Sequence, residues 1–416
     1  MKIRLLFHGF VIAALLNTTT TLSQQNDLNR ASFEKALIEC ADYVSTVVLD
    51  DEGKSRCDYN MTEGIWYPYE IPWHTGQAIL GLLAAYEITQ DSTYLKKAIE
   101  GGDYWAGLQI EEGPLKGMLN AVHGDALGDE FVVFATVSDG TPGIYELSKI
   151  TKNQKYASVA TSAASWLLEH TYYAEEGVCY DVIHPSGKVL KQNSPFWKDL
   201  ENRQSLFHVS RPNTEGSLFL DAFDFTADKV FKDAFINLCN SLVEKQGSEG
   251  LWMQFMPNHS DAKTFHPRFN IWYAESLIRA FETTKDRKYL EAAAKTARVY
   301  QKAQKADGTM YYKNYIDDTP PDRGSICGSA VAFSGILWMK LAHYGYTEFN
   351  DSIDLSANWL FKNRYKSDHP DVNLAGAVIN TRVRYKRENK IWFVNRDVGT
   401  SFALRFFKDY IHYKFD

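Results

Sequence analysis

Apolar and polar positions alternate along this chain in blocks of helical character. Each block opens with an apolar run rich in small residues, such as "GQAILGLLAAYEI" at residues 76–88. An amphipathic run follows, such as "YLKKAIEGGDYWAGLQ" at residues 94–109. A helix that is apolar all round is buried, whereas a helix with one polar face lies at the surface. Each block therefore predicts a hairpin made of one inner and one outer helix.

A short motif marks the turn between the two helices of a hairpin. It begins with Thr, has Asp or Asn two residues later, and ends with an aromatic residue. The copies start at Thr89, Thr151, Thr226 and Thr284, with a weaker copy at Thr347, so the steps are 62, 75, 58 and 63 residues. Asp and Asn are favourable N-caps, and the aromatic residue is expected to pack back across the turn. The motif predicts the start of each outer helix.

A second marker ends most of the blocks. An acidic residue followed by Gly suits a helix stop and a tight turn. The pairs are Glu52-Gly53, Glu112-Gly113, Glu176-Gly177, Glu249-Gly250 and Asp307-Gly308. Short strand-like or looped segments follow these pairs and lead into the next apolar helix.

The two ends of the chain complete the pattern. Helices are expected at about residues 30–48 and 399–413, and pairing them closes a ring of six hairpins. An internal repeat of this length overrides the two or three domains that length alone suggests. We predict an all-α fold, a single (α/α)6 toroid over residues 24–416. A two-domain helical protein is the structural alternative.

The first 23 residues have the pattern of a secretory signal peptide. Lys2 and Arg4 precede an apolar run from Leu5 to Leu16, and small polar residues follow. No later stretch is long and apolar enough to span a membrane. We therefore expect a periplasmic or secreted protein, with no membrane span in the mature chain. Nothing in the sequence predicts its oligomeric state.

Charge and cysteine usage exclude several functions. The net charge is −7, and removal of Lys2 and Arg4 takes it to −9, which argues against nucleic acid as a partner. The five cysteines show no C-x-x-C spacing, so no zinc ribbon or redox motif is predicted. Export permits a bridge such as Cys40–Cys57, which the sequence leaves open. Aromatic residues make up 14% of the chain and serve either the core or a sugar-stacking groove.

Three segments carry a resemblance to a known family. They are "GLW" at residues 250–252, "ADGTMYY" at 306–312 and "GSAVAFSGILWM" at 328–339. With the hairpin period, they resemble the six-hairpin glycosidase superfamily over essentially the whole mature chain. The nearest members are unsaturated glucuronyl and rhamnogalacturonyl hydrolases, and the chain is also similar to the exported oligosaccharide dehydratase of ulvan degradation. The resemblance implies the toroid and an activity on sugars.

The resemblance also implies where catalytic carboxyl groups should lie. Those enzymes place Asp residues at the entrances of the second and third inner helices. The matching positions here hold Asp139 and the pair Thr214-Glu215. Asp139 fits the family pattern, whereas "RPNTEG" at residues 211–216 departs from it. That departure puts ordinary family hydrolysis in doubt.

Charged and aromatic side chains gather at the predicted entrances of the inner helices. Arginines suit a carboxylate or sulfate ligand, because guanidinium offers paired donors. The substrate-binding candidates are Arg211, Arg268, Arg323, Arg396, Asn213, His74, His266, Trp66 and Trp73. The catalytic candidates are His208, His123, Tyr273, Glu215 and Asp139. For each arginine the alternative is a pair with a neighbouring acid, such as Asp397 or Asp322, and for each histidine or ring it is a structural role.

Two reactions fit this inventory. In hydrolysis or hydration, Asp139 and Glu215 protonate the substrate and activate water. In β-elimination, Arg or Asn neutralises a uronate, His or Tyr removes the C5 proton, and an acid protonates the leaving oxygen. We favour elimination on the terminal uronate of an anionic, ulvan-like oligosaccharide, with water or a sugar leaving. A non-catalytic glycan-binding protein is the third possibility. No H-x-x-x-H or H-E-x-x-H spacing occurs, so neither metal nor cofactor is predicted.

Overall fold

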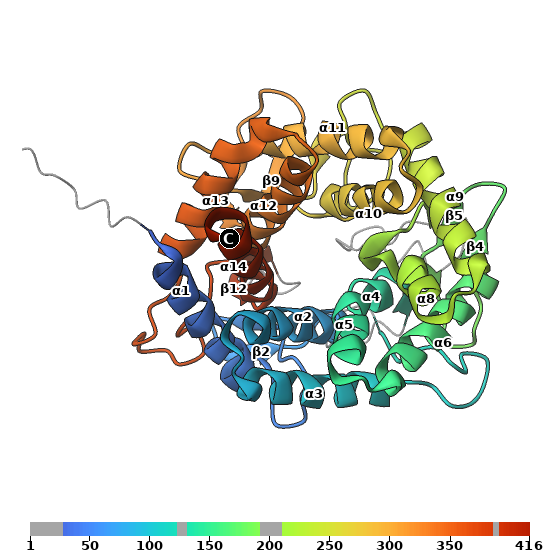
Figure 1. The fold of residues 1–416 in the computed structure, drawn as a ribbon, viewed down its shortest axis with the longest axis horizontal. Helices are drawn as coiled ribbons and strands as arrows, with labels where there is room; N and C mark the ends of the chain where they lie inside the picture. Colours follow the sequence, from blue (N-terminus) through green and yellow to red (C-terminus); the bar gives the residue numbers. More distant parts are fainter. Residues whose placement is uncertain (1–27, 123–130, 192–209, 386–390) are drawn as a thin grey trace, which may run out of the picture.

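The helices form two concentric rings, one inside the other. The computed structural model describes residues 28–122, 131–191, 210–385 and 391–416. The inner helices of these residues are α2 (Ile71–Thr89), α5 (Thr141–Thr151), α8 (Leu218–Thr226), α10 (Phe269–Thr284), α12 (Gly328–His343) and α14 (Val398–Phe415). The outer ones are α1 (Arg30–Tyr43), α3 (Ser92–Gly107), α6 (Gln154–Thr171), α9 (Lys229–Lys245), α11 (Arg287–Ala303) and α13 (Asn350–Lys362). Figure 1 looks into this ring and confirms the predicted (α/α)6 toroid.

The repeated turn motif caps the outer helices as predicted. The side chains of Asp91, Asn153, Asp228 and Asp286 each accept the N–H two residues ahead, at 2.9–3.1 Å. The Thr hydroxyl two residues before each cap accepts the cap's own N–H. The copy at Thr347 differs, because a 3₁₀ turn (η3, Thr347–Phe349) leads into α13 there. The acidic-Gly markers are also confirmed, since all five glycines have a positive φ.

The two ends of the chain close the ring. Helix α1 packs against α14, and α14 also lies between α12 and α2. The first helix continues as a π turn (η1, Val44–Val48). Buried side chains of both rings form one continuous core. Within it, the indoles of Trp252 and Trp338 donate to backbone carbonyls of the outer helices α9 and α11. No helix in the described residues is long and apolar enough to cross a membrane.

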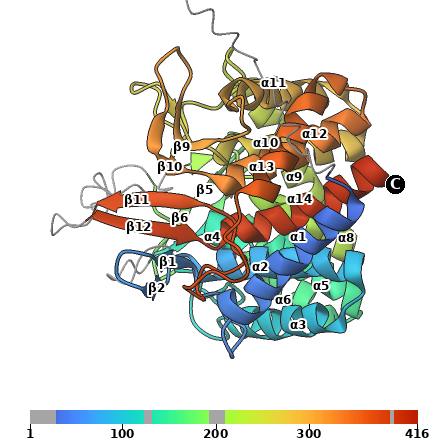
Figure 2. The same cartoon turned by 90° about the vertical axis from the view of Figure 1, so that its left-hand side faces the viewer.

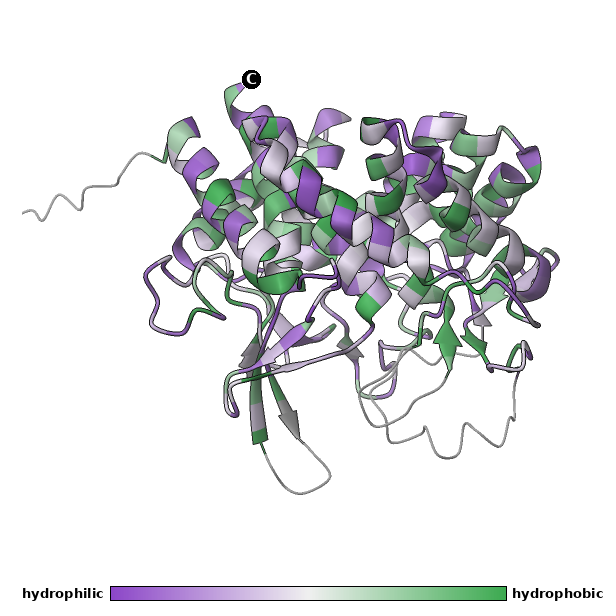
Figure 3. Ribbon diagram, turned by 90° about the horizontal axis from the view of Figure 1, so that it is seen from below, coloured by the Kyte–Doolittle hydropathy of each residue, from purple (hydrophilic) through white to green (hydrophobic). Residues whose placement is uncertain are grey.

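Small antiparallel sheets lie together at one end of the ring (Figures 2 and 3). One has the order β11-β12-β1-β2, and another has the order β10-β9-β8. Their bounds are β1 (Asp58–Asn60), β2 (Ile65–Tyr67), β8 (Thr264–Phe265), β9 (Tyr311–Tyr315), β10 (Asp322–Ile326), β11 (Thr381–Tyr385) and β12 (Ile391–Arg396). The remaining strands are β3 (Val132–Val133), β4 (Tyr172–Tyr173), β5 (Val178–Tyr180), β6 (Val182–Ile183) and β7 (Ser210–Arg211). Strands lead into the inner helices, so this end of the ring holds the inner-helix entrances.

Strand register places charged residues at these entrances. Asp58 on β1 lies directly opposite Arg396 on β12. Cys179 on β5 lies opposite Arg211 on β7, which brings Arg211 beside Asp181, two residues further on. Cross-strand neighbours lie close enough for side chains to pair. Two arginines thus receive their carboxylate partners from another strand or strand-end.

A glycine allows the second and third inner-helix entrances to meet. Gly216 has φ +65°, and a Cβ there would lie 1.9 Å from the carbonyl oxygen of Ser138. Gly216 follows Glu215 in a 3₁₀ turn (η2, Glu215–Ser217), and Ser138 ends the short helix α4 (Phe134–Ser138) before Asp139. No other residue fits this contact without displacing backbone. The close approach brings the Glu215 and Asp139 segments together.

Candidate active site

Asp139 is a buried carboxyl group at the entrance of α5. Its side chain is 6% exposed, and Oδ1 has no hydrogen-bond partner among the described residues. Gln77 from α2 donates to its backbone carbonyl and fixes the turn. Burial and the nearby charge of Glu215 raise the pKa of Asp139 well above its usual value. Asp139 is therefore a neutral acid that can donate a proton.

Glu215 lies in a closed ionic network with Arg211. Each carboxylate oxygen accepts from a different terminal nitrogen of Arg211, both at 2.9 Å. Burial raises the pKa of Glu215 to about 6, and Arg211 limits the rise. Because Arg211 bonds Glu215 and none of the described groups bonds Asp139 Oδ1, the proton shared by the two acids resides on Asp139.

Arg211 is fully buried and fully partnered. Besides Glu215, its Nε donates to Asp181, and Asn213 donates to the other oxygen of Asp181 at 2.7 Å. The guanidinium carbon lies 4.8 Å from the ring centroid of Phe269. Two carboxylates thus surround one cation. The structure places Arg211 and Asn213 beneath the entrance, holding Glu215, and not as groups free to receive a ligand.

Tyr273 joins the same network from α10. Its hydroxyl accepts from Arg211 at 3.3 Å, and its ring packs edge-on against Trp252 and Phe269. The side chain is fully buried, and burial raises the pKa of the phenol well above its usual value. A base role needs a lowered pKa, which these surroundings do not produce. Tyr273 is a neutral hydroxyl in the packed wall of the site.

Glu70 is a site residue that the sequence pattern did not indicate. It is 4% exposed and directly precedes α2, with φ 52° and ψ 48°. A non-glycine residue in this left-handed conformation costs about 1–2 kcal/mol, and such outliers cluster at functional sites. Its charge contributes to the raised pKa of both Asp139 and Glu215. Its only sequence signal is an acid immediately before the "IPWH" helix start.

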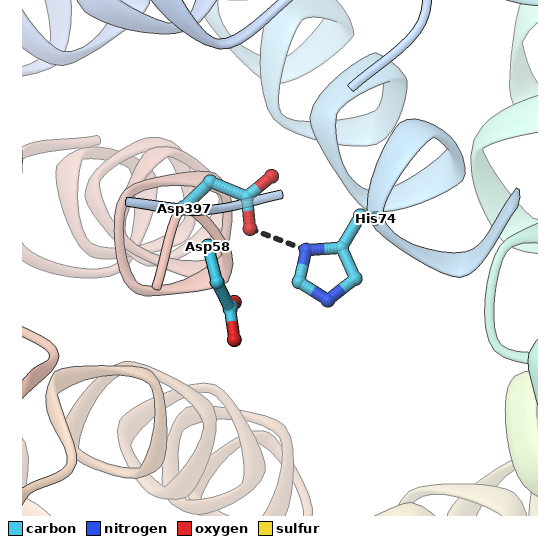
Figure 4. Close-up of side chains that lie close together, drawn as sticks. All are labelled: Asp58, His74 and Asp397. Atoms are coloured by element: carbon cyan, nitrogen blue, oxygen red, sulfur yellow. Dashed lines mark hydrogen bonds and ion pairs between the residues drawn. The ribbon is translucent and has the colours of Figure 1, made fainter. Parts of the chain in front are cut away.

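Arg396 is held by a second chain of contacts, which involves Asp58 on β1, His74 on α2 and Asp397 before α14. Figure 4 draws these last three side chains without Arg396. Its Nε donates to Asp58 at 2.9 Å, and its Nη2 lies 3.1 Å from Nε2 of His74. Nδ1 of His74 lies 2.5 Å from Asp397, as the dashed line in Figure 4 shows. His74 therefore donates a hydrogen bond from Nδ1–H to Asp397 and accepts one from Arg396 at Nε2. The expected alternative partner of Arg396, Asp397, holds His74 instead.

The same three side chains resemble a metal-binding set. Ligand atoms of Asp58, His74 and Asp397 lie within 4.8 Å of one another, and all three residues are buried. The guanidinium of Arg396 already supplies the positive charge between them and uses the Nε2 lone pair of His74. A metal ion would have to displace that guanidinium. These residues are better suited to hold the side chain of Arg396 than to bind a metal ion, and we assign no metal to them.

Arg268 differs from the other buried arginines of the site. It is 3% exposed, and within the described residues its guanidinium donates a hydrogen bond to the hydroxyl of Ser329 at 2.6 Å. It forms no ion pair with a carboxylate in the described part of the chain. An unpaired buried charge is expensive, so an anionic ligand is the expected partner. Its charge also acts on Asp139, which locates both groups at one site.

Guanidinium groups and aromatic rings alternate across the entrance. The indole of Trp73 has Arg396 at 5.5 Å and Arg268 at 5.3 Å from its ring. Tyr69 continues the series beyond Arg396, and Tyr312 and then Arg382 continue it beyond Arg268, with spacings of 5.4–6.0 Å. Nε1 of Trp73 is buried and has no partner among the described residues. We name these six residues the cation–ring series.

His266 lies beside this series at the start of α10. Its Nδ1 accepts the backbone N–H of Arg268 and of Phe269, both at 3.2 Å. Burial, followed by the charges of Arg268, Arg382 and Arg396, lowers the pKa of His266 well below its usual value. His266 is therefore neutral and is brought into the site, as the sequence predicts.

Other predicted residues lie elsewhere. The ring of Trp66 on β2 lies tilted against that of Tyr59, with ring centroids 5.1 Å apart, and its indole N–H donates to Asn373 at 3.0 Å. Arg323 lies exposed on β10, apart from the contacts described above. His123 and His208 lie outside the described residues, as does the predicted signal peptide. All five cysteines are buried and free, so Cys40 and Cys57 form no bridge.

Two decisive acids escaped the sequence patterns. Asp58 lies on a three-residue strand, and Asp181 lies between two short strands. Neither has a helical period or a motif around it, because each reaches its arginine through strand pairing. Their roles follow only from the fold.

Comparison with known proteins supports the fold. Neither a family model nor a curated protein matches the sequence. Cellobiose 2-epimerase from Bacillus thermoamylovorans B4167 matches with a TM-score of 0.66 at 12% identity, over 92% of this chain and 99% of that one. Unsaturated glucuronyl hydrolase from Bacillus sp. GL1 matches with a TM-score of 0.62 at 13% identity, over 90% and 96%. A polysaccharide lyase matches with a TM-score of 0.59 at 12% identity, over 92% and 98%. The chain therefore has the six-hairpin toroid that these proteins share.

Proposed function

We propose that this protein is an exported carbohydrate-active enzyme that acts on the terminal uronic acid of anionic oligosaccharides by β-elimination. The observation that carries the proposal is a buried guanidinium, Arg268, which has no carboxylate partner among the described residues and whose charge acts on the buried acid Asp139. A uronate supplies the missing negative charge. The rings of the cation–ring series suit a pyranose face.

The reaction divides among these groups in a simple way. Arg268 neutralises the uronate carboxylate, which makes the C5 proton more acidic. A base removes that proton, its electron pair forms the C4–C5 double bond, and the C4–O bond breaks. Asp139 gives its proton to the departing oxygen. The base is the sequence-predicted His208, which lies outside the described residues. Water leaves in a dehydratase, and a sugar leaves in an exo-acting lyase.

Hydrolysis of an already unsaturated uronate is the second candidate. The neutral Asp139 favours it, because an acid at this place can also protonate a double bond. The structural likeness to an unsaturated glucuronyl hydrolase also favours hydrolysis. Against it, both oxygens of Glu215 are bound by Arg211, which leaves Glu215 poorly placed to activate water. Elimination needs no second free carboxylate.

The test is ultraviolet absorbance of conjugated unsaturated uronates, followed on saturated and on unsaturated uronate oligosaccharides. Elimination raises the absorbance of the saturated substrate, and mass spectrometry separates loss of water from loss of a sugar. A fall on the unsaturated substrate means hydrolysis and rejects our proposal. Binding measured by calorimetry without any product rejects both reactions and favours a glycan-binding protein.

Export rests on residues 1–23. We expect the protein isolated from its native host to lack this segment and to be found in the periplasm or medium. Mass determination of the intact chain checks this, and a full-length cytoplasmic chain would contradict it.

A further inference from the structure

The imidazole of His266 is held in one orientation by the backbone around it. The backbone N–H of His266 donates to the side chain of Asn258 at 2.9 Å, and the backbone carbonyl of His266 accepts from the hydroxyl of Tyr300 at 2.7 Å. Nδ1 then accepts two backbone N–H groups at the start of α10. A nitrogen that accepts hydrogen bonds carries no proton, so the single proton of the neutral ring is on Nε2.

The groups that face His266 keep it uncharged. Burial is the main cause of its lowered pKa, and the charges of Arg268 at the start of α10, Arg382 on β11 and Arg396 on β12 lower it further. A helix N-terminus also disfavours a positive charge. The ring is half-buried, and Nε2 has no hydrogen-bond partner among the described residues. The site therefore presents a fixed neutral donor next to an unpaired guanidinium.

We propose that Nε2–H of His266 and the guanidinium of Arg268 together bind the carboxylate of the terminal uronate and make His266 a specificity-determining residue. This rests on the proposed function, because it names the groups that read the acid. One oxygen takes the charged donor and the other takes the neutral donor. As C5 loses its proton, charge moves onto these oxygens, and both donors are already in place.

A neutral donor has a clear advantage at this position. A protonated His266 would add a positive charge between three arginines and would lose the two N–H bonds that Nδ1 accepts. A histidine acting as the base would need a free lone pair toward the substrate. The lone pair of His266, on Nδ1, instead accepts the two N–H groups at the start of α10. His266 thus recognises the substrate and leaves proton abstraction to another group.

Two substitutions separate the two ring nitrogens. Asn at 266 places an acceptor near Nδ1 and keeps the α10 contacts, but it has no donor near Nε2. Gln reaches further and restores a donor near Nε2, with weaker support of α10. We expect H266N to lower kcat/KM on a saturated uronate oligosaccharide by about 10²-fold to 10³-fold, as the loss of one preorganised donor does. H266Q should retain most of the activity lost in H266N.

Binding provides a readout that does not depend on turnover. Glucuronate is titrated into wild type, H266N and H266Q, with glucose as the neutral counterpart. Wild type should prefer glucuronate, H266N should lose that preference while keeping the circular dichroism and melting profile of wild type, and H266Q should regain part of it. If H266N prefers glucuronate as strongly as wild type, the inference is wrong. If the contrast holds but no unsaturated product forms, the elimination proposal fails and the carboxylate subsite stands.

The tautomer is measured directly by nitrogen NMR of the ¹⁵N-histidine-labelled enzyme, with the His266 signal assigned by its absence in H266N. We expect a protonated Nε2 and an unprotonated Nδ1 across the pH range of activity. A proton on Nδ1, or a doubly protonated ring, would overturn the assignment even if the substitutions reduce activity.

Discussion

The two arginines at the centre of the site, Arg211 and Arg268, are almost equally buried but are partnered in opposite ways. Arg211 is enclosed by Asp181 and Glu215 and needs nothing from outside. Arg268 has a serine hydroxyl and two aromatic rings around it. Burying a charge is tolerable only when it is paired and hydrogen-bonded. The first arginine is therefore part of the protein's own structure, and the second is the arginine to which we propose that the substrate's carboxylate binds.

The contrast also separates two kinds of failure. Removing a member of a closed ion network leaves buried charges uncompensated, so it harms folding. Removing the cation of an open site harms binding, because the protein has not used that charge for its own stability. The four experiments that follow test this division.

The largest effect is expected from Arg211→Met, which leaves Asp181 and Glu215 buried without their cation. We expect a loss of about 3–5 kcal/mol in the free energy of unfolding, measured by urea denaturation. The control is Arg30→Met, which breaks exposed ion pairs with Glu34 and Asp416 and should leave the free energy of unfolding almost unchanged. Equal losses in the two variants would show that the Arg211 network is not a structural element.

Arg268→Gln should give the reverse result. We expect kcat/KM on uronate substrates to fall by about 10²-fold to 10³-fold, the usual cost of a lost electrostatic contact to the reacting group. The free energy of unfolding should change by about 1 kcal/mol or less, since no carboxylate of the described residues loses a partner. The matched control is Arg298→Gln on α11, an exposed arginine paired with Glu348. Destabilisation as large as in Arg211→Met would remove the contrast.

Asp139→Asn tests the protonation of Asp139, on which the charges of both arginines act. The folded pKa of Asp139 is raised above its unfolded value of 3.8, so protonation favours the folded state. This contribution is complete below the unfolded pKa and is lost as pH rises through the folded one. The stability of wild type relative to Asp139→Asn, measured by urea denaturation, should therefore fall as the pH rises above the unfolded pKa of 3.8. A difference that rises with pH would mean that Asp139 is ionised in the folded protein.

The smallest change is expected from Glu215→Gln, because Asp181 still pairs with the cation of Arg211 in this variant. The substitution removes a charge that raises the pKa of Asp139. Loss of that charge lowers the pKa of Asp139, and the freed cation of Arg211 acts in the same direction. Because the protonated Asp139 is the active form, the alkaline limb of kcat/KM should move to lower pH. Activity at the acidic end should persist. If the alkaline limb of kcat/KM stays at the same pH, the group that titrates there is not Asp139.

The fold was predictable because local physics repeats in it. The Thr and Asp or Asn of each turn motif make the same two hydrogen bonds at Asp91, Asn153, Asp228 and Asp286, so one pattern read four times locates four hairpins. The glycine markers act in the same way, since each requires a positive φ. Helix periodicity then assigns inner and outer helices. Each of these signals spans only a few residues, so it can be recognised without knowledge of the rest of the chain.

The site was only partly predictable, because its decisive contacts join distant segments. Arg268, Arg396, His74, His266, Trp73 and Asp139 were indicated by their place before apolar helices, and the fold brings them together. The sequence does not show which acid pairs with which arginine. Asp58 and Asp181 reach their arginines across short strands, and Glu70 lies before α2 in a left-handed backbone conformation. Whether an arginine is closed or open depends on those pairings.

The packing of the first helix against the last has a consequence for how the protein is made. Asp58 and its partner Arg396 are 338 residues apart in sequence, so their ion pair forms only when segments from opposite parts of the described chain meet. Helix α14 must then fit between α12, α2 and α1. A partly synthesised chain therefore has neither a closed ring nor an assembled anion site. Closure of the ring and assembly of the site therefore depend on the same long-range contacts.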